Sequence, residues 1–314
     1  MNFNVLFIIL TLPVFASCTL FSGGDQKDEP KLSKDDQKKL AEYQAEVTLG
    51  RDMGGRLLQY YGTYGNEDVI GYVNQVGSYV ASVGDFPERR YMFAILDTDS
   101  VNAFACPGGY ILITKGALEL AESEAELAMI LGHEVAHVGL QHMYNTLKKM
   151  GDREIEKEAE EASEKGQMDK AYASEVRRRP EADNSASAEL ISRYLSQSAG
   201  AGMTLLKAAK AGMNVLLEKG LDEKLEFEAD EVGVSWAIRA GYEPFGMLRF
   251  LNRLAKKKKN KKDSSTKILD KTHPKVSDRK ARIKKLLADM NAKEIVGAKG
   301  NDRFEKALKP LKTK

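Results

Sequence analysis

Apolar residues recur every three or four positions through much of the chain, which is the spacing of one face of an α-helix. Helical spacing of this kind is found over residues 40–60, 69–80, 223–240, 244–256 and 277–290. Gly241 and then Pro244 follow the third of these runs and form a helix stop signal. The pattern predicts a mainly helical domain whose first two elements are helices.

Two short runs break this helical spacing. Residues 91–96 and 110–114 are rich in β-branched, aromatic and other large apolar residues and predict a small β-sheet. The stretch between them contains Pro107-Gly108-Gly109 and is expected to turn. We consider residues 110–114 a candidate strand for pairing with an extended substrate, the alternative being an ordinary edge strand.

A long helix carries the candidate chemistry. Ser123 followed by Glu126 is a capping-box signal before an apolar run, which predicts a helix from about 123 to about 148. Inside it, His133-Glu134-Val135-Ala136-His137 matches the H-E-x-x-H pattern. Residues four apart share a helix face, so both imidazoles can bind one zinc ion. Glu134 is displaced by about 100° from His133 and can act as a base without being a ligand.

A catalytic zinc site needs a third protein ligand and an open fourth position. The metzincin pattern would place glycine at 140 and histidine at 143, but the chain has Leu140 and Met143 there. His142 lies about 140° around the predicted helix from His137, so we expect it at the surface or, less favoured, in a role supporting a ligand.

A carboxylate from a distant helix is the alternative third ligand. Glu226 and Asp230 lie four residues apart and share a helix face. We therefore predict that Glu226 binds the metal and that Asp230 orients a ligand histidine through a hydrogen bond.

These residues define a mechanism. One Zn²⁺ per chain, held by His133, His137 and Glu226, is expected to activate a water and polarise the scissile carbonyl. Glu134 takes the proton as general base and returns it to the leaving amine. His273, in the turn before Pro274, is expected to stabilise the oxyanion or to occupy the open zinc position, with a purely structural turn as the alternative.

Five segments, in order, resemble the zinc peptidase family that includes the CAAX prenyl protease, HtpX and BepA. They are Asn102–Tyr110, His133–His137, Glu226–Gly233, Gly241–Pro244 and Thr272–Ile283. The resemblance implies an α+β fold, mainly α-helical, of the zincin-like, gluzincin type, with a small sheet next to the H-E-x-x-H helix over residues 40–290. It also implies a periplasmic protease of the soluble branch that acts on envelope proteins.

The N-terminus predicts export. Residues 3–17 are almost wholly apolar, and at about 15 residues they fall short of the roughly 20 of a spanning helix, so residues 1–17 are interpreted as a signal peptide. The residues up to Cys18 resemble a lipoprotein box, which would make Cys18 the lipidated first residue. Simple secretion and an uncleaved anchor are the alternatives. Residues 18–39 would then tether the domain to the membrane surface.

The net charge is close to zero, so only local charged segments are informative. The 48 basic and 46 acidic residues give a net charge of +2, which argues against a nucleic-acid partner. Residues 151–197 are expected to form a charged insertion outside the core, and residues 198–220 are expected to form a closely packed helix or a lid. Residues 256–262 are expected to form a solvated basic loop or a contact for anionic lipid. Residues 291–314 are expected to form a basic tail. Cys106, without an evident disulfide partner, is expected to be buried.

The most concrete predicted function is a zinc-dependent endopeptidase that cleaves unfolded or misfolded envelope proteins. An envelope chaperone or assembly factor with a peptidase fold is the first alternative, and a zinc hydrolase of another substrate is the second. Glu134 favours the peptidase, because a chaperone does not need a general base.

Overall fold

The computed structural model describes residues 33–150, 157, 205–259 and 264–312. The predicted signal peptide, the lipidation site Cys18 and nearly all of the charged insertion lie outside these residues.

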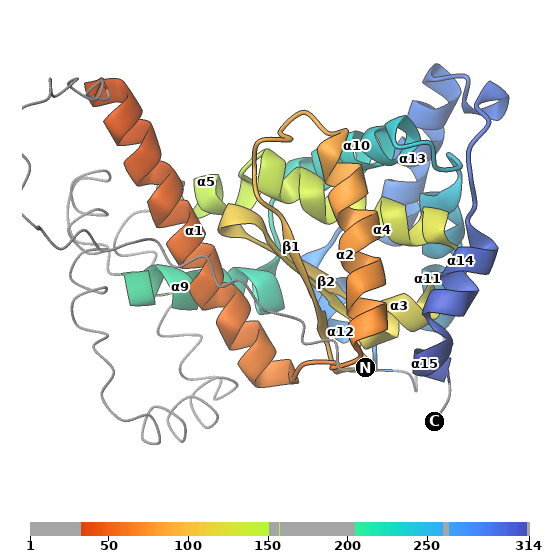
Figure 1. Cartoon of the computed structure of the whole chain (residues 1–314), viewed down its shortest axis with the longest axis horizontal. Helices are drawn as coiled ribbons and strands as arrows, with labels where there is room; N and C mark the ends of the chain where they lie inside the picture. The colour runs from red at the N-terminus through yellow and green to blue at the C-terminus, as the bar shows by residue number, and fades with distance from the viewer. Residues whose placement is uncertain (1–32, 151–156, 158–204, 260–263, 313–314) are drawn as a thin grey trace, which may run out of the picture.

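The described elements confirm a mainly helical fold with a small sheet (Figure 1). The N-terminal half contains α1 (Lys34–Tyr61), α2 (Glu67–Ser82), β1 (Met92–Leu96), β2 (Ala103–Cys106), the 3-10 turn η1 (Pro107–Gly109), β3 (Tyr110–Thr114), α3 (Lys115–Leu120), α4 (Glu124–Gly139) and α5 (His142–Lys149). The C-terminal half contains α9 (Leu205–Asn214), the π-helical η2 (Val215–Lys219), α10 (Glu223–Arg239), α11 (Gly246–Lys259), α12 (Lys267–Thr272), α13 (Val276–Asp289), η3 (Ala292–Glu294), α14 (Asn301–Ala307) and α15 (Lys309–Lys312).

The sheet has the order β1-β3-β2, with β1 parallel and β2 antiparallel to β3. The prediction that residues 110–114 could receive a substrate strand is therefore wrong, because both edges of β3 are already paired. The two edges of the sheet are β1 and β2, and β2 lies in the stretch expected to turn. Thr114 fixes its start: the Asn102 N–H donates to Thr114 Oγ1 (3.0 Å) and the Thr114 N–H donates to the Asn102 carbonyl (3.0 Å).

Helix α4 lies at the centre of the domain, and all its residues are buried. Helices α2, α10 and α11 and the sheet pack around it (Figure 1). The closest approach is between α4 and α10, where glycine faces glycine. A Cβ on Gly132 would lie 2.7 Å from the Gly233 carbonyl oxygen, and a Cβ on Gly233 would lie 2.5 Å from the His133 nitrogen. Only glycine allows this backbone contact, which brings the H-E-x-x-H segment next to the helix that carries Glu226.

The helix predicted to run to about residue 148 ends earlier. Helix α4 stops at Gly139, Gln141 adopts a left-handed φ of 57°, and α5 begins at His142 in a new direction. A residue far away in the sequence contacts this turn. Glu46 of α1 is buried, and its Oε2 accepts a hydrogen bond from Gln141 Nε2 (2.5 Å). A contact across 95 residues leaves no local pattern, so the helical spacing alone could not reveal the break.

The C-terminal segment is part of the domain. Residues 291–314 were expected to form a basic tail, but Phe304 is fully buried and Arg303 forms two bonds to Glu124, from Nε to Oε2 (3.0 Å) and from Nη2 to Oε1 (2.5 Å). The predicted boundary at 290 is therefore too early. Residues 291–314 contain few apolar residues among many charged ones, so their apolar face could not be recognised from the sequence.

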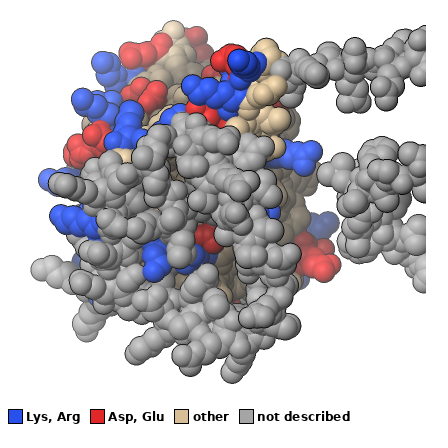
Figure 2. Space-filling view, turned by 90° about the vertical axis from the view of Figure 1, so that its left-hand side faces the viewer, with Lys and Arg blue, Asp and Glu red and all other residues tan. Residues whose placement is uncertain are grey.

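The surface carries mixed charge. Where described residues are visible in Figure 2, basic and acidic side chains are interspersed. The basic run begins inside α11 rather than in a loop: Lys256 to Lys259 are helical, and Lys258 pairs with Asp270. Within the described ranges, no helix has both the length and the apolar character needed to cross a membrane.

Candidate metal centre

The three predicted ligands meet. His133 and His137 lie one turn apart on α4, with their Nε2 atoms 3.1 Å apart. Glu226 of α10 faces both, with Oε2 3.6 Å from His133 Nε2 and Oε1 3.5 Å from His137 Nε2. All three side chains are buried, and their donor atoms lie within 4.8 Å of one another. The structure thus assembles two nitrogens and one carboxylate around a common point.

This donor set fits a cation. Glu226 Oε2 is buried and has no hydrogen-bond partner among the described residues. Burial favours the neutral acid, but His273, His137 and His133 hold the pKa of Glu226 well below its ordinary range, so the carboxylate is ionised. A buried carboxylate facing two imidazole nitrogens is a common donor set for a divalent transition metal. A metal ion between them would satisfy all three groups.

His133 lies beside Asp230, the residue predicted to orient a ligand histidine. His133 Nδ1 lies 3.0 Å from Asp230 Oδ1. Arg279 of α13 in turn donates two hydrogen bonds to Asp230, from Nε (2.8 Å) and from Nη2 (2.6 Å). This arrangement keeps a proton on Nδ1 and leaves Nε2 for a metal. Burial lowers the pKa of His133, but Asp230 outweighs it and raises that pKa to about 10, so metal binding near neutral pH must displace a proton.

His142 was favoured as a surface residue, and that prediction is wrong. Its side chain is buried, and its Nδ1 lies 3.0 Å from His137 Nδ1. The angle expected from a continuous helix does not apply, because the chain turns at Gln141. On its other side, His142 Nε2 lies 3.4 Å from Glu228 Oε2. If His137 binds a metal through Nε2, its Nδ1–H donates to His142 Nδ1, and His142 carries its proton on Nε2, facing Glu228.

Two substitutions at His142 separate hydrogen bonding from packing. In His142→Asn, the side-chain Oδ1 stands near the position of Nδ1 and can still accept from His137, whereas His142→Leu fills the space without an acceptor. We expect His142→Leu to weaken metal binding about 10- to 100-fold and His142→Asn to weaken it less, measured by competition with a chelator. If His142 acted only through packing, metal binding would be weakened more in His142→Asn than in His142→Leu. A larger loss in the asparagine variant would therefore contradict the supporting role.

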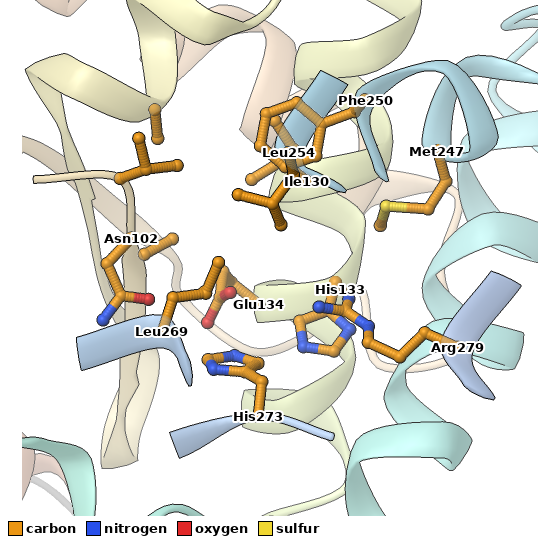
Figure 3. A pocket seen from close by; sticks show the side chains of 13 residues that line it. Asn102, Ile130, His133, Glu134, Met247, Phe250, Leu254, Leu269, His273 and Arg279 are labelled. Carbon is orange, nitrogen blue, oxygen red and sulfur yellow. The ribbon is translucent and has the colours of Figure 1, made fainter. Parts of the chain in front are cut away.

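Glu134 and His273 complete the site. Glu134 is buried, and burial raises its pKa to about 7 despite the opposing charge of His133. A carboxylate with a pKa near 7 is suited to proton transfer at neutral pH. His273 follows α12, with Nε2 3.6 Å from Glu226 Oε2 and Nδ1 3.0 Å from Thr272 Oγ1. Glu134, His133 and His273 converge at one end of a cavity (Figure 3). The two roles predicted for His273 both remain predictions.

A second cavity lies on the other side of the site and is bordered by η2. Its lining includes Val215, Leu216 and Gly220 together with Glu134 and His137. The helical alternative for residues 198–220 holds over 205–214, where α9 buries Ala208, Ala209 and Ala211. Residues 198–204 lie outside the described ranges, and a lid role stays a prediction. Cys106 is buried as expected, and burial raises the pKa of its thiol.

The sequence predicts the three candidate ligands and Asp230 but assigns no role to three residues that support this site. Arg279 stood out only as part of a resemblance, and Glu228 and Gln141 carried no signal that distinguishes them from surface residues. Glu228 is one of several acidic residues on α10, so its position gains meaning only once His142 is seen beside it.

Comparisons with known proteins give a family match over the part of the chain that carries this site. The model of peptidase family M48 matches residues 69–287. The beta-barrel assembly-enhancing protease of Escherichia coli (strain K12) is 25% identical over 183 residues, which are 58% of this chain and 32% of that protein. A Vibrio cholerae protein with a corresponding name is 26% identical over 215 residues, 68% of this chain and 38% of that protein. The mitochondrial metalloendopeptidase OMA1 of Schizosaccharomyces pombe is 27% identical over 111 residues, 35% of this chain and 31% of that protein. The matches thus span between 31% and 38% of the length of these relatives.

Proposed function

The chain belongs to peptidase family M48, and on that premise we propose that it is a zinc-dependent endopeptidase of the bacterial cell envelope. The observation that carries the proposal is the meeting of His133, His137 and Glu226, with Glu134 beside them. The names of the bacterial relatives support a role in the assembly of β-barrel proteins. We infer that the substrates are unfolded or misassembled proteins of that kind.

Each residue of the site has a task in this mechanism. His133, His137 and Glu226 would hold one zinc ion, and Asp230 and His142 would keep the two imidazoles oriented. Bound zinc supplies a Lewis acid that lowers the pKa of water to about 7 and polarises a carbonyl. Glu134 takes a proton from the attacking water and returns it to the leaving amine. His273 either donates a hydrogen bond to the developing oxyanion or occupies the open ligand position.

We propose that the substrate pairs with the free edge of β2, not with β3. Asn102 directs its backbone groups to Thr114 of β3, so the alternate residues Ala103 and Ala105 direct theirs to the opposite edge. Ala103 borders both cavities beside Glu134. An extended peptide along this edge would place a carbonyl near Glu134 and the metal ligands. Main-chain pairing needs no fixed side-chain sequence, which suits unfolded substrates.

Export and anchoring rest on the N-terminal sequence. The apolar run ending at Cys18 supports a lipid anchor that holds the domain on the periplasmic side of a membrane. Residues 18–39 would span from the membrane surface to the first turns of α1.

Cleavage of an unfolded outer-membrane β-barrel protein tests the proposed function. We expect the zinc-loaded protein to produce fragments on a gel, a chelator to abolish them, and added Zn²⁺ to restore them, because the three ligands cannot polarise a carbonyl without the ion. The same β-barrel protein in its folded form is the control and should stay intact. Fragments that persist without metal would contradict the mechanism, and zinc-loaded protein that prevents aggregation without cutting would favour the chaperone alternative.

A further inference from the structure

Glu46 is a buried carboxylate that no step of the proposed mechanism uses. It lies on α1, and its side chain is 1% exposed. Its Oε1 accepts hydrogen bonds from Arg89 Nη1 (2.9 Å) and from the Gly108 N–H (3.1 Å), and its Oε2 accepts one from Gln141 Nε2 (2.5 Å). The charge of Arg89 compensates the buried carboxylate. One side chain therefore connects α1 to segments that lie 43, 62 and 95 residues away in the sequence.

Gln141 has a strained backbone. Its φ of 57° lies in the left-handed region, and among the described residues Asn291 is the only other non-glycine residue with a positive φ. Asparagine tolerates this conformation better than glutamine does, because its short side chain can hydrogen-bond to the nearby backbone. A hydrogen bond to a charged carboxylate is stronger than one to a neutral group. The Glu46 contact therefore stabilises the turn at Gln141 against the continued helix that the sequence predicts.

The turn at Gln141 determines where His142 lies. His142 begins α5, and its Nδ1 lies 3.0 Å from Nδ1 of the proposed ligand His137. The ring centroids are 5.0 Å apart and the rings are nearly perpendicular, at 81°. On a continuous helix, His142 would instead lie about 140° around the axis from His137. A series of contacts thus runs from Glu46 through Gln141 and His142 to His137.

We propose that Glu46 is a positioning residue for the metal centre. By holding the turn at Gln141, it keeps His142 against His137 and so raises the affinity of the site for zinc. The inference rests on the proposed function, because it needs the zinc site, but it concerns metal binding and not cleavage. Helix α1 precedes residues 69–287, which the family model matches. The role of Glu46 is therefore a property of this chain that the family match does not supply.

An exchange of the groups at positions 46 and 141 tests the proposal. Gln141→Glu places a second carboxylate against Glu46, and the two repel each other. We expect the zinc affinity, measured by competition with a chelator, to fall about 10- to 100-fold. Adding Glu46→Gln should restore most of the affinity. The introduced amide then donates to the introduced carboxylate, and its carbonyl oxygen still accepts from Arg89 and Gly108.

Two further variants separate positioning from general stability. Glu42 lies one turn earlier on α1 and pairs with Lys148 of α5. Glu42→Gln is therefore the matched control, and it should neither weaken zinc binding nor rescue Gln141→Glu. His142→Leu already lacks the group through which Glu46 acts, so in that background Gln141→Glu should weaken zinc binding little further. If Gln141→Glu does not fold, Gln141→Ala removes the same hydrogen bond without adding a charge, and the comparison in the His142→Leu background is made with it.

The zinc affinity is measured without any cleavage, so this inference and the proposed function can fail separately. Unchanged affinity in Gln141→Glu, no rescue by Glu46→Gln, or an equal loss with and without His142 would overturn the inference even if the protein cleaves its substrate. Loss and rescue of zinc affinity in a protein that cuts no substrate would support the inference and refute the proposed function.

Discussion

Glu134→Gln lowers kcat by about 100- to 10,000-fold and leaves the metal in place. Glutamine has nearly the same shape as glutamate and fits the same buried position. The side chain at this position is not one of the three that would hold the ion, so metal binding is kept. Glutamine cannot accept a proton from the attacking water, so cleavage is lost. The three ligand residues and their supports are untouched. We expect wild-type metal content by elemental analysis and near-zero cleavage in the same sample.

The stability of this variant carries a second expectation. Burial raises the pKa of Glu134 to about 7, whereas a glutamate in the unfolded chain titrates near 4.3. The folded metal-free protein therefore loses stability as the pH rises from about 4 to about 7. Glutamine removes this loss, so thermal unfolding of the metal-free variant at pH 8 should occur at a temperature no lower than that of the wild type.

Glu119→Gln, the same chemical change on an exposed side of α3, is the control and should alter neither activity nor stability. Substantial cleavage by Glu134→Gln with full metal content would remove Glu134 from its role as base. Loss of metal in Glu134→Gln would instead mean that the carboxylate helps to hold the ion.

Features set by residues close together in the chain could be predicted from the sequence, and features set by contacts between distant residues could not. His133 and His137 follow from a four-residue spacing on one helix, and such local rules hold wherever the helix forms. Glu226 required a chemical rule, the need for a third ligand, in addition to a second helix. Both kinds of inference placed residues that the structure brings together.

The features that escaped prediction are set by distant contacts. Strand β2 has only four residues, two of them alanines with low β-propensity, and it is a strand because β3 pairs with it. His142 faces His137 because Glu46, on another helix, holds the left-handed turn at Gln141. The glycines that let α4 and α10 touch were visible in the sequence, but not the reason for them. Local spacing therefore predicted the two candidate histidine ligands better than it predicted the residues that contact them.

The support of His133 should be among the most sensitive parts of the fold. Asp230 is fully buried and lies beside both Arg279 and His133, and the Arg279 charge contributes more than His133 to keeping it ionised. Removing one partner of a buried ion pair costs about 3–5 kcal/mol, because the other charge stays in the interior without compensation. Arg279→Leu should lower the free energy of unfolding by that amount and also weaken metal binding, since Asp230 loses the contacts that aim it at His133.

The stability lost in Arg279→Leu is expected to depend on pH. Burial tends to raise the pKa of Asp230, but the Arg279 charge and its hydrogen bonds prevail and hold that pKa well below the usual range. A depressed folded-state pKa contributes stability above the unfolded value, near 3.9, and this contribution is lost as acid protonates the carboxylate. The difference between Arg279→Leu and wild type should therefore be largest at neutral pH and shrink as the pH falls below about 4.

Two comparisons in urea unfolding decide whether the buried charge is the cause. Arg282→Leu, on the same helix with an exposed ion pair to Glu231, should cost under about 1 kcal/mol. The double variant Arg279→Leu, Asp230→Asn should be more stable than Arg279→Leu alone, because it leaves no unpaired carboxylate in the interior. If the double variant instead loses the sum of the two single losses, the destabilisation comes from lost packing, and the ion pair does not hold α13 to the metal centre.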